Sequence, residues 1–214
     1  DTKLFYQARG EFLVPKGTWT ALSSEFVDSA APDEEMVKAL ADAGTYYVGL
    51  GIESGDEAVQ ARNRKRIDLD RARKVVRLCQ DNGILTKAFF ILGLPGETPE
   101  ALARTRRFIE ALDSDLIVLG YFFPVPFTPA YQEACESGRF TDVYPFDGKV
   151  LVNWVPPTID NDDLEQAMSS IYLSFYGPSR LARTVKRTLV NASPRELGSL
   201  ICDGLYLLQS SLGL

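Results

Sequence analysis

The stretch GLGIESGDEAV, residues 49–59, passes directly from an apolar run into a segment with helical character. The run it completes, residues 46–52 (YYVGLGI), is almost entirely apolar, as a strand buried on both faces must be. Glu53 and Ser54 follow at once, between two glycines. In parallel α/β folds the sites form beyond the carboxyl ends of strands. This turn is therefore the first candidate for a functional site.

The same unit recurs along the chain. Residues 85–92 (LTKAFFIL) read as a strand followed by the turn GLPGE at 93–97, and residues 18–26 and 116–121 read as further strands. Parallel strands need crossover connections, usually helices. We therefore predict an α/β fold, a partial TIM-like barrel of parallel strands. The helices expected between the strands run from about Pro32 to Gly44, from about Glu57, from Leu69 to Asp81 with Asp68 as N-cap, and from Pro99 to Leu112 with Thr98 as N-cap.

After Pro124 the pattern of alternating strands and helices ends. We predict two parts: residues 1–138, the barrel portion, and residues 139–214, a mostly helical C-terminal extension. Within the extension we expect a loop with one short strand at 149–154, and helices over 162–176, over 180–189 and from 193 onward.

The composition excludes several kinds of site. The chain contains no histidine, so it cannot supply a Ser-His-Asp triad, a histidine zinc ligand or a histidine ligand to a corrinoid cobalt. Its three cysteines, Cys79, Cys135 and Cys202, are too far apart in sequence to form a local cluster. Cys79 falls on the apolar face of a predicted helix, which indicates a buried free thiol and a reducing, cytoplasmic location. No apolar run is long enough to cross a bilayer.

The charge pattern leaves two interpretations of the segment from Arg62 to Arg77, which carries eight Lys or Arg residues against Asp68 and Asp70. It could be a nucleic-acid face or a solvated outer helix face. The net charge of −6 and the lack of interleaved aromatic residues favour the solvated face. A second basic stripe on a predicted helix is also expected to be solvated; it consists of Arg180, Arg183, Lys186 and Arg187.

The chemistry of the two turns also leaves alternatives. Glu53 supplies a carboxylate suited to an ammonium group or a ribose diol, and the glycines would let a flat ligand approach the backbone. Glu53 could equally cap the following helix, and GLPGE could be a plain strand-to-helix turn. If both turns do form a site, they should lie side by side, since they follow successive parallel strands.

Three stretches resemble the second half of a radical S-adenosylmethionine (SAM) barrel. They are GLGIESGDEAV, residues 63–105 (ending in FFILGLPGETPEALART) and residues 121–138 (YFFPVPFTPAYQEACESG). The pattern is most similar to the cobalamin-binding-domain class of the family, whose members also have a helical C-terminal region. The resemblance implies binding of SAM, chemistry that depends on a [4Fe-4S] cluster, and a small-molecule substrate.

The resemblance also implies roles for particular residues. Glu53 and Ser54 would hold the methionyl amine or ribose of SAM, and Lys65, with Arg64, would pair with its carboxylate. The remaining implied contacts are Ile91, Leu92 and Gly93 for adenine, Pro95 and Glu97 for the shape of the turn, and Tyr121 and Phe122 for the substrate wall.

The chain departs from the family pattern in four places. It lacks both the C-x3-C-x2-C cluster motif and the D-x-H-x-x-G cobalamin motif. Pro126-Phe127-Thr128 has no glycine where the family shows P-G-T, and Ser23-Ser24 stands where many relatives carry arginine. We therefore expect cluster ligands outside this chain, a missing N-terminal segment and no activity from this chain alone, with cobalamin a candidate cofactor. Two other functions stay open: a non-catalytic α/β nucleotide-binding or interaction module, and an RNA-binding partial barrel using Arg62 to Arg77.

Overall fold

A computed structural model describes residues 34–65, 67–141 and 152–191 of the protein. Its centre is a parallel sheet in the order β1-β2-β3. The strands are β1 (Tyr47–Glu53), β2 (Leu85–Leu92) and β3 (Leu116–Tyr121). The predicted α/β fold is confirmed. The expected strand at 18–26, the helix from 193 and residues 149–151 of the strand expected at 149–154 lie outside the described residues. Of the other residues of that expected strand, only Trp154 lies in a strand.

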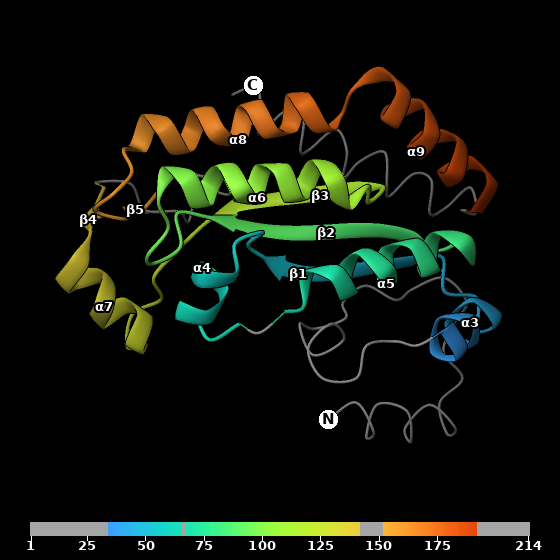
Figure 1. Ribbon diagram of the computed structural model, residues 1–214, viewed down its shortest axis with the longest axis horizontal. Helices are drawn as coiled ribbons and strands as arrows, with labels where there is room; N and C mark the ends of the chain where they lie inside the picture. Colours follow the sequence, from blue (N-terminus) through green and yellow to red (C-terminus); the bar gives the residue numbers. More distant parts are fainter. Residues whose placement is uncertain (1–33, 66, 142–151, 192–214) are drawn as a thin grey trace.

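Three helices of the sheet region begin at capping residues, of which Asp68 and Thr98 were predicted. Asp56, Asp68 and Thr98 each accept a hydrogen bond from the backbone N–H three residues on, which satisfies a helix donor that would otherwise have no partner. The helices are α3 (Glu34–Asp42), α4 (Glu57–Arg62), α5 (Leu69–Asp81) and α6 (Pro99–Leu112). Figure 1 shows α5 and α6 running along the sheet, and the two helices contact each other.

One hydrophobic core joins these helices to the sheet. Alternate strand residues point into it, because successive side chains of a strand face opposite sides. Phe90 of β2 is buried there with its ring edge-on to Phe108 of α6, 6.2 Å between centroids. The strand and α5 members are Val48, Leu50, Ile52, Ala88, Phe90, Leu92, Ile117, Leu119, Ala72, Val75, Val76 and Cys79. Cys79 is a buried free thiol, as predicted.

The C-terminal part begins with a helix that the sequence analysis missed. α7 (Pro129–Ser137) starts where the prolines were taken to end the array, with Thr128 as its N-cap and Pro129 in its first turn. A short antiparallel pair follows, β4 (Arg139–Phe140) with β5 (Trp154–Val155). α8 (Asn161–Phe175) and α9 (Pro178–Asn191) complete the described chain.

α8 covers the outer edge of β3. The backbone N–H groups of Ile117 and Leu119 donate to the hydroxyl oxygens of Tyr176 and Tyr172, at 3.1 and 3.0 Å. The Tyr176 hydroxyl in turn donates to the Ile117 carbonyl at 3.2 Å. These bonds satisfy strand groups that another strand would otherwise pair with. The two tyrosines therefore close this edge of the sheet.

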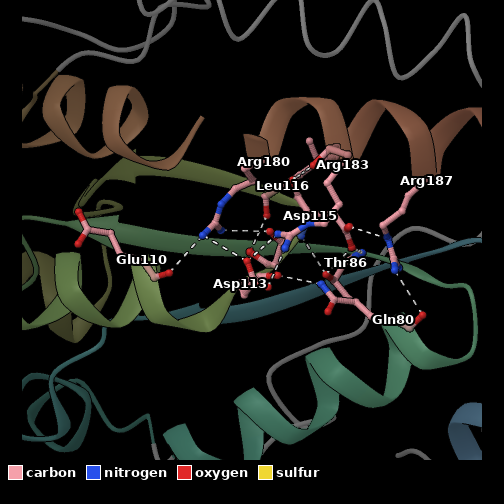
Figure 2. Close-up of polar contacts among 11 residues, drawn as sticks. Gln80, Thr86, Glu110, Asp113, Asp115, Leu116, Arg180, Arg183 and Arg187 are labelled. Carbon is pink, nitrogen blue, oxygen red and sulfur yellow. Dashed lines mark hydrogen bonds and ion pairs between the residues drawn. The ribbon is translucent and has the colours of Figure 1, made fainter. Parts of the chain in front are cut away.

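α9 is held to the start of β3 by its arginines, as Figure 2 shows. Arg183 donates to both carboxylate oxygens of Asp113, at 2.9 and 2.6 Å. Arg187 Nε lies 2.8 Å from the carboxylate of Asp115, which is fully buried. Arg180 reaches the Glu110 and Ser114 carbonyls. The prediction of a solvated stripe was therefore wrong for these three arginines, because the opposing acidic side chains come from a distant part of the chain.

Candidate functional site

The turns after β1 and β2 lie side by side at one rim of the sheet. The two strands are parallel neighbours, and Glu53 at the end of β1 pairs in register with Phe90, beyond a bulge at Gly51. A hydrogen bond of 3.0 Å from the Asn63 side chain to the Pro95 carbonyl ties the segment after the first turn to the second turn. The predicted adjacency of the two turns is confirmed. Figure 1 shows α4 and α7 at this same end of the strands.

Glu53 has an unusual backbone conformation for its residue type. Its φ of 67° lies in the left-handed region, which typically costs a residue with a Cβ about 1–2 kcal/mol. Asp56 caps the following helix, so the interpretation of Glu53 as a helix cap is wrong. Its carboxylate instead lies 3.4 Å from the Lys65 ammonium, and the two side chains are 18% and 36% exposed. A residue with a strained backbone, at the end of a strand and with a partly accessible charged side chain, is typical of a functional position.

Ser54 and Gly55 anchor the turn to α6. The Ser54 hydroxyl is fully buried, lies 3.1 Å from the Thr105 hydroxyl, and accepts the Asp56 backbone N–H. A Cβ on Gly55 would lie 2.5 Å from Phe108 Cβ and 2.8 Å from the Thr105 backbone, so only glycine fits this contact. Within the predicted pair, Glu53 therefore has the side chain that reaches the surface, while the Ser54 hydroxyl is occupied by internal hydrogen bonds.

The second turn is built around a buried carboxyl group. Gly93, with φ of 78°, donates its N–H to Glu97 Oε2 at 2.5 Å. Glu97 is fully buried, and its Oε1 has no hydrogen-bond partner among the described residues. Burial, with a smaller contribution from the nearby Asp56 charge, raises the pKa of Glu97 to about 7. The sequence analysis assigned Glu97 only to the shape of the turn; its burial was not visible in the local pattern.

Several of the other residues predicted to contact SAM or the substrate make interactions within the protein. The Leu92 carbonyl accepts the Phe122 N–H at 2.8 Å, and Ile91 packs against a small cluster of Val59, Leu94 and Ala101. Phe122 lies edge-on to Trp154, with 5.4 Å between ring centroids. Arg64 is exposed with φ of 57°, and Pro95 is buried. Tyr121 is half-buried, and burial together with Glu165 raises the pKa of its phenol.

The basic segment before and along α5 does not form a continuous cationic face. Arg62 pairs with Glu133 at 2.6 Å, Lys65 with Glu53, and Arg73 with Asp70. The Arg73 guanidinium also lies over the Phe108 ring, 4.6 Å from its centroid. These contacts give three of the cations partners within the chain, which supports the interpretation of a surface helix face.

The described cysteines do not suit an iron–sulfur cluster. Cys79 faces the core between α5 and the sheet, and burial raises the pKa of its thiol to about 12, against the thiolate a metal requires. Cys135 is exposed on α7. Across 34–65, 67–141 and 152–191, no three His, Cys, Asp or Glu side chains gather as a metal site. None of the helices in these ranges has the length and apolar character of a membrane span.

Similarity to known proteins was found over the sheet region. The profile of the radical SAM superfamily matches residues 16–109. The anaerobic magnesium-protoporphyrin IX monomethyl ester cyclase of Rubrivivax gelatinosus is 28% identical over 146 residues, which are 67% of this chain and 26% of that protein. The chain thus spans about a quarter of the length of this relative.

Two solved structures share the fold. The Escherichia coli coproporphyrinogen III oxidase HemN, a radical SAM enzyme, aligns with a TM-score of 0.54 at 18% identity, over 81% of this chain and 36% of that chain. The radical SAM methyltransferase TsrM from Kitasatospora setae, solved with cobalamin and a [4Fe-4S] cluster, aligns with a TM-score of 0.51 at 19% identity, over 70% and 35% of the two chains. Residues 16–109, which contain both turns at the rim of the sheet, match the radical SAM superfamily.

Proposed function

We propose that the rim formed by the two turns binds and orients SAM for a radical SAM enzyme. The observation that carries the proposal is the Glu53–Lys65 pair, 3.4 Å apart at the carboxyl end of β1. The amino-acid end of SAM carries an ammonium and a carboxylate. Glu53 would pair with the ammonium or a ribose hydroxyl, and Lys65, assisted by Arg64, with the carboxylate. Glu53 would thus exchange its ion pair with Lys65 for one with the SAM ammonium. Lys65 would exchange its ion pair with Glu53 for one with the SAM carboxylate.

The second turn would support the adenine. We assign backbone groups of Ile91, Leu92 and Gly93 to it, next to Pro95, with Ser54 shaping the first turn and Tyr121 and Phe122 bordering the substrate. Glu97 and the left-handed Gly93 and Gly96 hold this backbone in one conformation, so little ordering entropy would be lost on binding. When bound beside a reduced [4Fe-4S] cluster, SAM supplies a 5′-deoxyadenosyl radical that abstracts hydrogen from the substrate.

The cluster ligands would come from residues outside this chain, since the positions of Cys79 and Cys135 do not suit them. We accordingly propose that residues 1–138 provide the barrel portion and 139–214 a helical extension, and that the chain alone is inactive. Cobalamin stays a candidate cofactor, supported by the likeness in fold to a cobalamin-containing methyltransferase. A small-molecule substrate and a cytoplasmic location are part of the same proposal.

Isothermal titration of SAM into the purified protein tests the assignment. Glu53→Gln should weaken binding about 10- to 100-fold, since a hydrogen bond to a charged group contributes about 1.5–3 kcal/mol. Glu57→Gln, on the exposed first turn of α4, is the matched control and should bind SAM as the wild type does. Equal affinities for Glu53→Gln and wild type, with unchanged melting temperatures, would show that Glu53 does not contact SAM.

A further inference from the structure

α9 contacts the rest of the protein through polar side chains. The one buried side chain in its described part is Thr184, whose hydroxyl donates to the Asp115 carbonyl at 3.0 Å. Arg180, Arg183 and Arg187 extend from the same helix to the residues before β3, as Figure 2 shows. The face of α9 that meets the sheet is therefore its polar face.

The apolar residues of α9 lie on another side of the helix. Leu181, Val185 and Leu189 are between 49% and 60% exposed. They are spaced four residues apart, so they form one stripe along the helix, which we call the outer stripe. At 3.6 residues per turn, Val185 lies about 100° around the helix from Thr184. An amphipathic helix ordinarily turns its apolar stripe to the core, whereas α9 turns its polar face inward. A contiguous set of exposed apolar side chains marks a contact surface.

The sequence directly after α9 carries a matching apolar pattern. Residues 193–208 read SPRELGSLICDGLYLL. Ser193 and Glu196 form the capping-box pattern S-x-x-E, which predicts a helix that begins at Pro194. Apolar residues then recur with the period of a helix, at Leu197, Leu200, Ile201, Leu205 and Leu208. The pattern therefore predicts an amphipathic helix whose apolar stripe needs a partner.

The connection between α9 and this predicted helix is short. α9 ends at Asn191, so Ala192 and Ser193 alone separate it from Pro194. Two helices joined by about two to five residues typically form an antiparallel hairpin. Counted from the connection in both directions, three pairs of apolar residues lie at nearly equal distances: Leu189 with Leu197, Val185 with Ile201, and Leu181 with Leu205. The two apolar stripes are thus in register.

The outer stripe has the size of a contact with one helix. From Leu181 to Leu189 the helix rises about 12 Å, at about 1.5 Å per residue, and a helix is about 10 Å wide. The resulting area of about 120 Å² is far below the roughly 800 Å² that each partner buries in a stable protein–protein interface. A segment tethered to α9 needs less area, because the tether keeps its effective concentration high. The area therefore favours a segment of this chain over a second copy.

We propose that residues 194–208 form a helix that packs antiparallel on the outer stripe of α9. α9 then has its polar face on the sheet and its apolar face on the C-terminal helix. Its arginines fix α9 to the start of β3, at the end of the sheet opposite the two turns, as Figure 1 shows. The pair of helices therefore covers the amino-terminal end of the sheet. This inference does not depend on the binding of SAM at the other end.

A double-mutant cycle tests the contact, with Val185→Ser and Ile201→Ser measured singly and together by thermal denaturation. Each single substitution should lower the melting temperature by about 4–8 °C, since each removes an apolar side chain from the packed pair. The double variant should lose less than the sum of the two shifts, because the two side chains touch. Val190→Ser, at an exposed position of α9 off the outer stripe, is the matched control. It should shift the melting temperature by less than about 2 °C and add to the effect of Ile201→Ser. Fully additive shifts for Val185→Ser and Ile201→Ser would overturn the proposal.

An engineered disulfide tests the same contact without relying on stability. In a full-length chain that carries Cys135→Ser and Cys202→Ser, the pair Val185→Cys and Ile201→Cys should oxidise to a disulfide within one chain, detected by mass spectrometry. The control pair, Val190→Cys with Ile201→Cys, should stay reduced. A disulfide between two chains would overturn the proposal, because it would show that a second copy occupies the outer stripe. Failure of the Val185→Cys and Ile201→Cys pair to cross-link would overturn it as well.

Discussion

Glu97 should make the stability of this protein depend on pH. Its carboxyl group is fully buried, and one oxygen accepts the Gly93 N–H while the other has no hydrogen-bond partner among the described residues. Burial, with the charge of Asp56, raises the pKa of Glu97 from 4.5 to about 7. Protonation is therefore favoured in the native state. Glu97→Gln mimics the protonated side chain in shape and removes the titration.

The size of the effect follows from the shift in pKa. A rise from 4.5 to about 7 is 2.5 pKa units, and at about 1.36 kcal/mol per unit this corresponds to roughly 3 kcal/mol. The folded pKa lies above the unfolded pKa. The contribution to the free energy of unfolding is thus fully present below about pH 4.5 and is lost as the pH rises through about 7. The wild type should lose roughly 3 kcal/mol relative to Glu97→Gln over this window.

Urea denaturation followed by circular dichroism, at intervals from about pH 4.5 to 8, measures this difference directly. Other titrating groups contribute equally to both proteins, so the change in the difference isolates Glu97. Glu136→Gln, an exposed substitution on α7, is the matched control and should follow the wild-type pH dependence. A difference between Glu97→Gln and wild type that stays constant with pH would refute the argument, because it would mean that Glu97 ionises as an exposed carboxyl does.

Three further substitutions test the fold. Arg187→Met should destabilise the protein by about 3 kcal/mol in urea, because the buried Asp115 charge loses its partner; a change below about 1 kcal/mol would mean that Asp115 needs no arginine. Tyr172→Phe should cost about 1–3 kcal/mol and speed amide exchange at Leu119, which loses its acceptor; unchanged exchange would contradict the edge-closing role. Phe127→Gly should raise the melting temperature, since Phe127 is 99% exposed with φ of 69° and glycine relieves about 1–2 kcal/mol of strain; a lower melting temperature would show that the phenyl ring packs in solution.

Local sequence signals were sufficient for the elements around the site. The bounds of β2 and α5 agree with the prediction, because the apolar period and the Asp68 cap act over a few residues. The adjacency of the two turns also followed from sequence, since successive parallel strands bring their carboxyl ends to one rim. The same reading missed α7, whose start at Thr128-Pro129 carries both a cap and a first-turn proline. Pro129 was interpreted as ending the array of strands and helices, whereas it lies in the first turn of a helix.

The partners of charged and buried groups depended on the tertiary structure. A helical stripe of arginines in the sequence shows only that the charges share one face of the helix. Arg187 pairs with Asp115, which is distant in sequence, because α9 packs against the start of β3. The burial of Glu97 is likewise set by surrounding segments. Backbone preference and capping are decided within one or two turns of chain. Burial and electrostatic pairing are decided by contacts that exist only once distant segments have packed together.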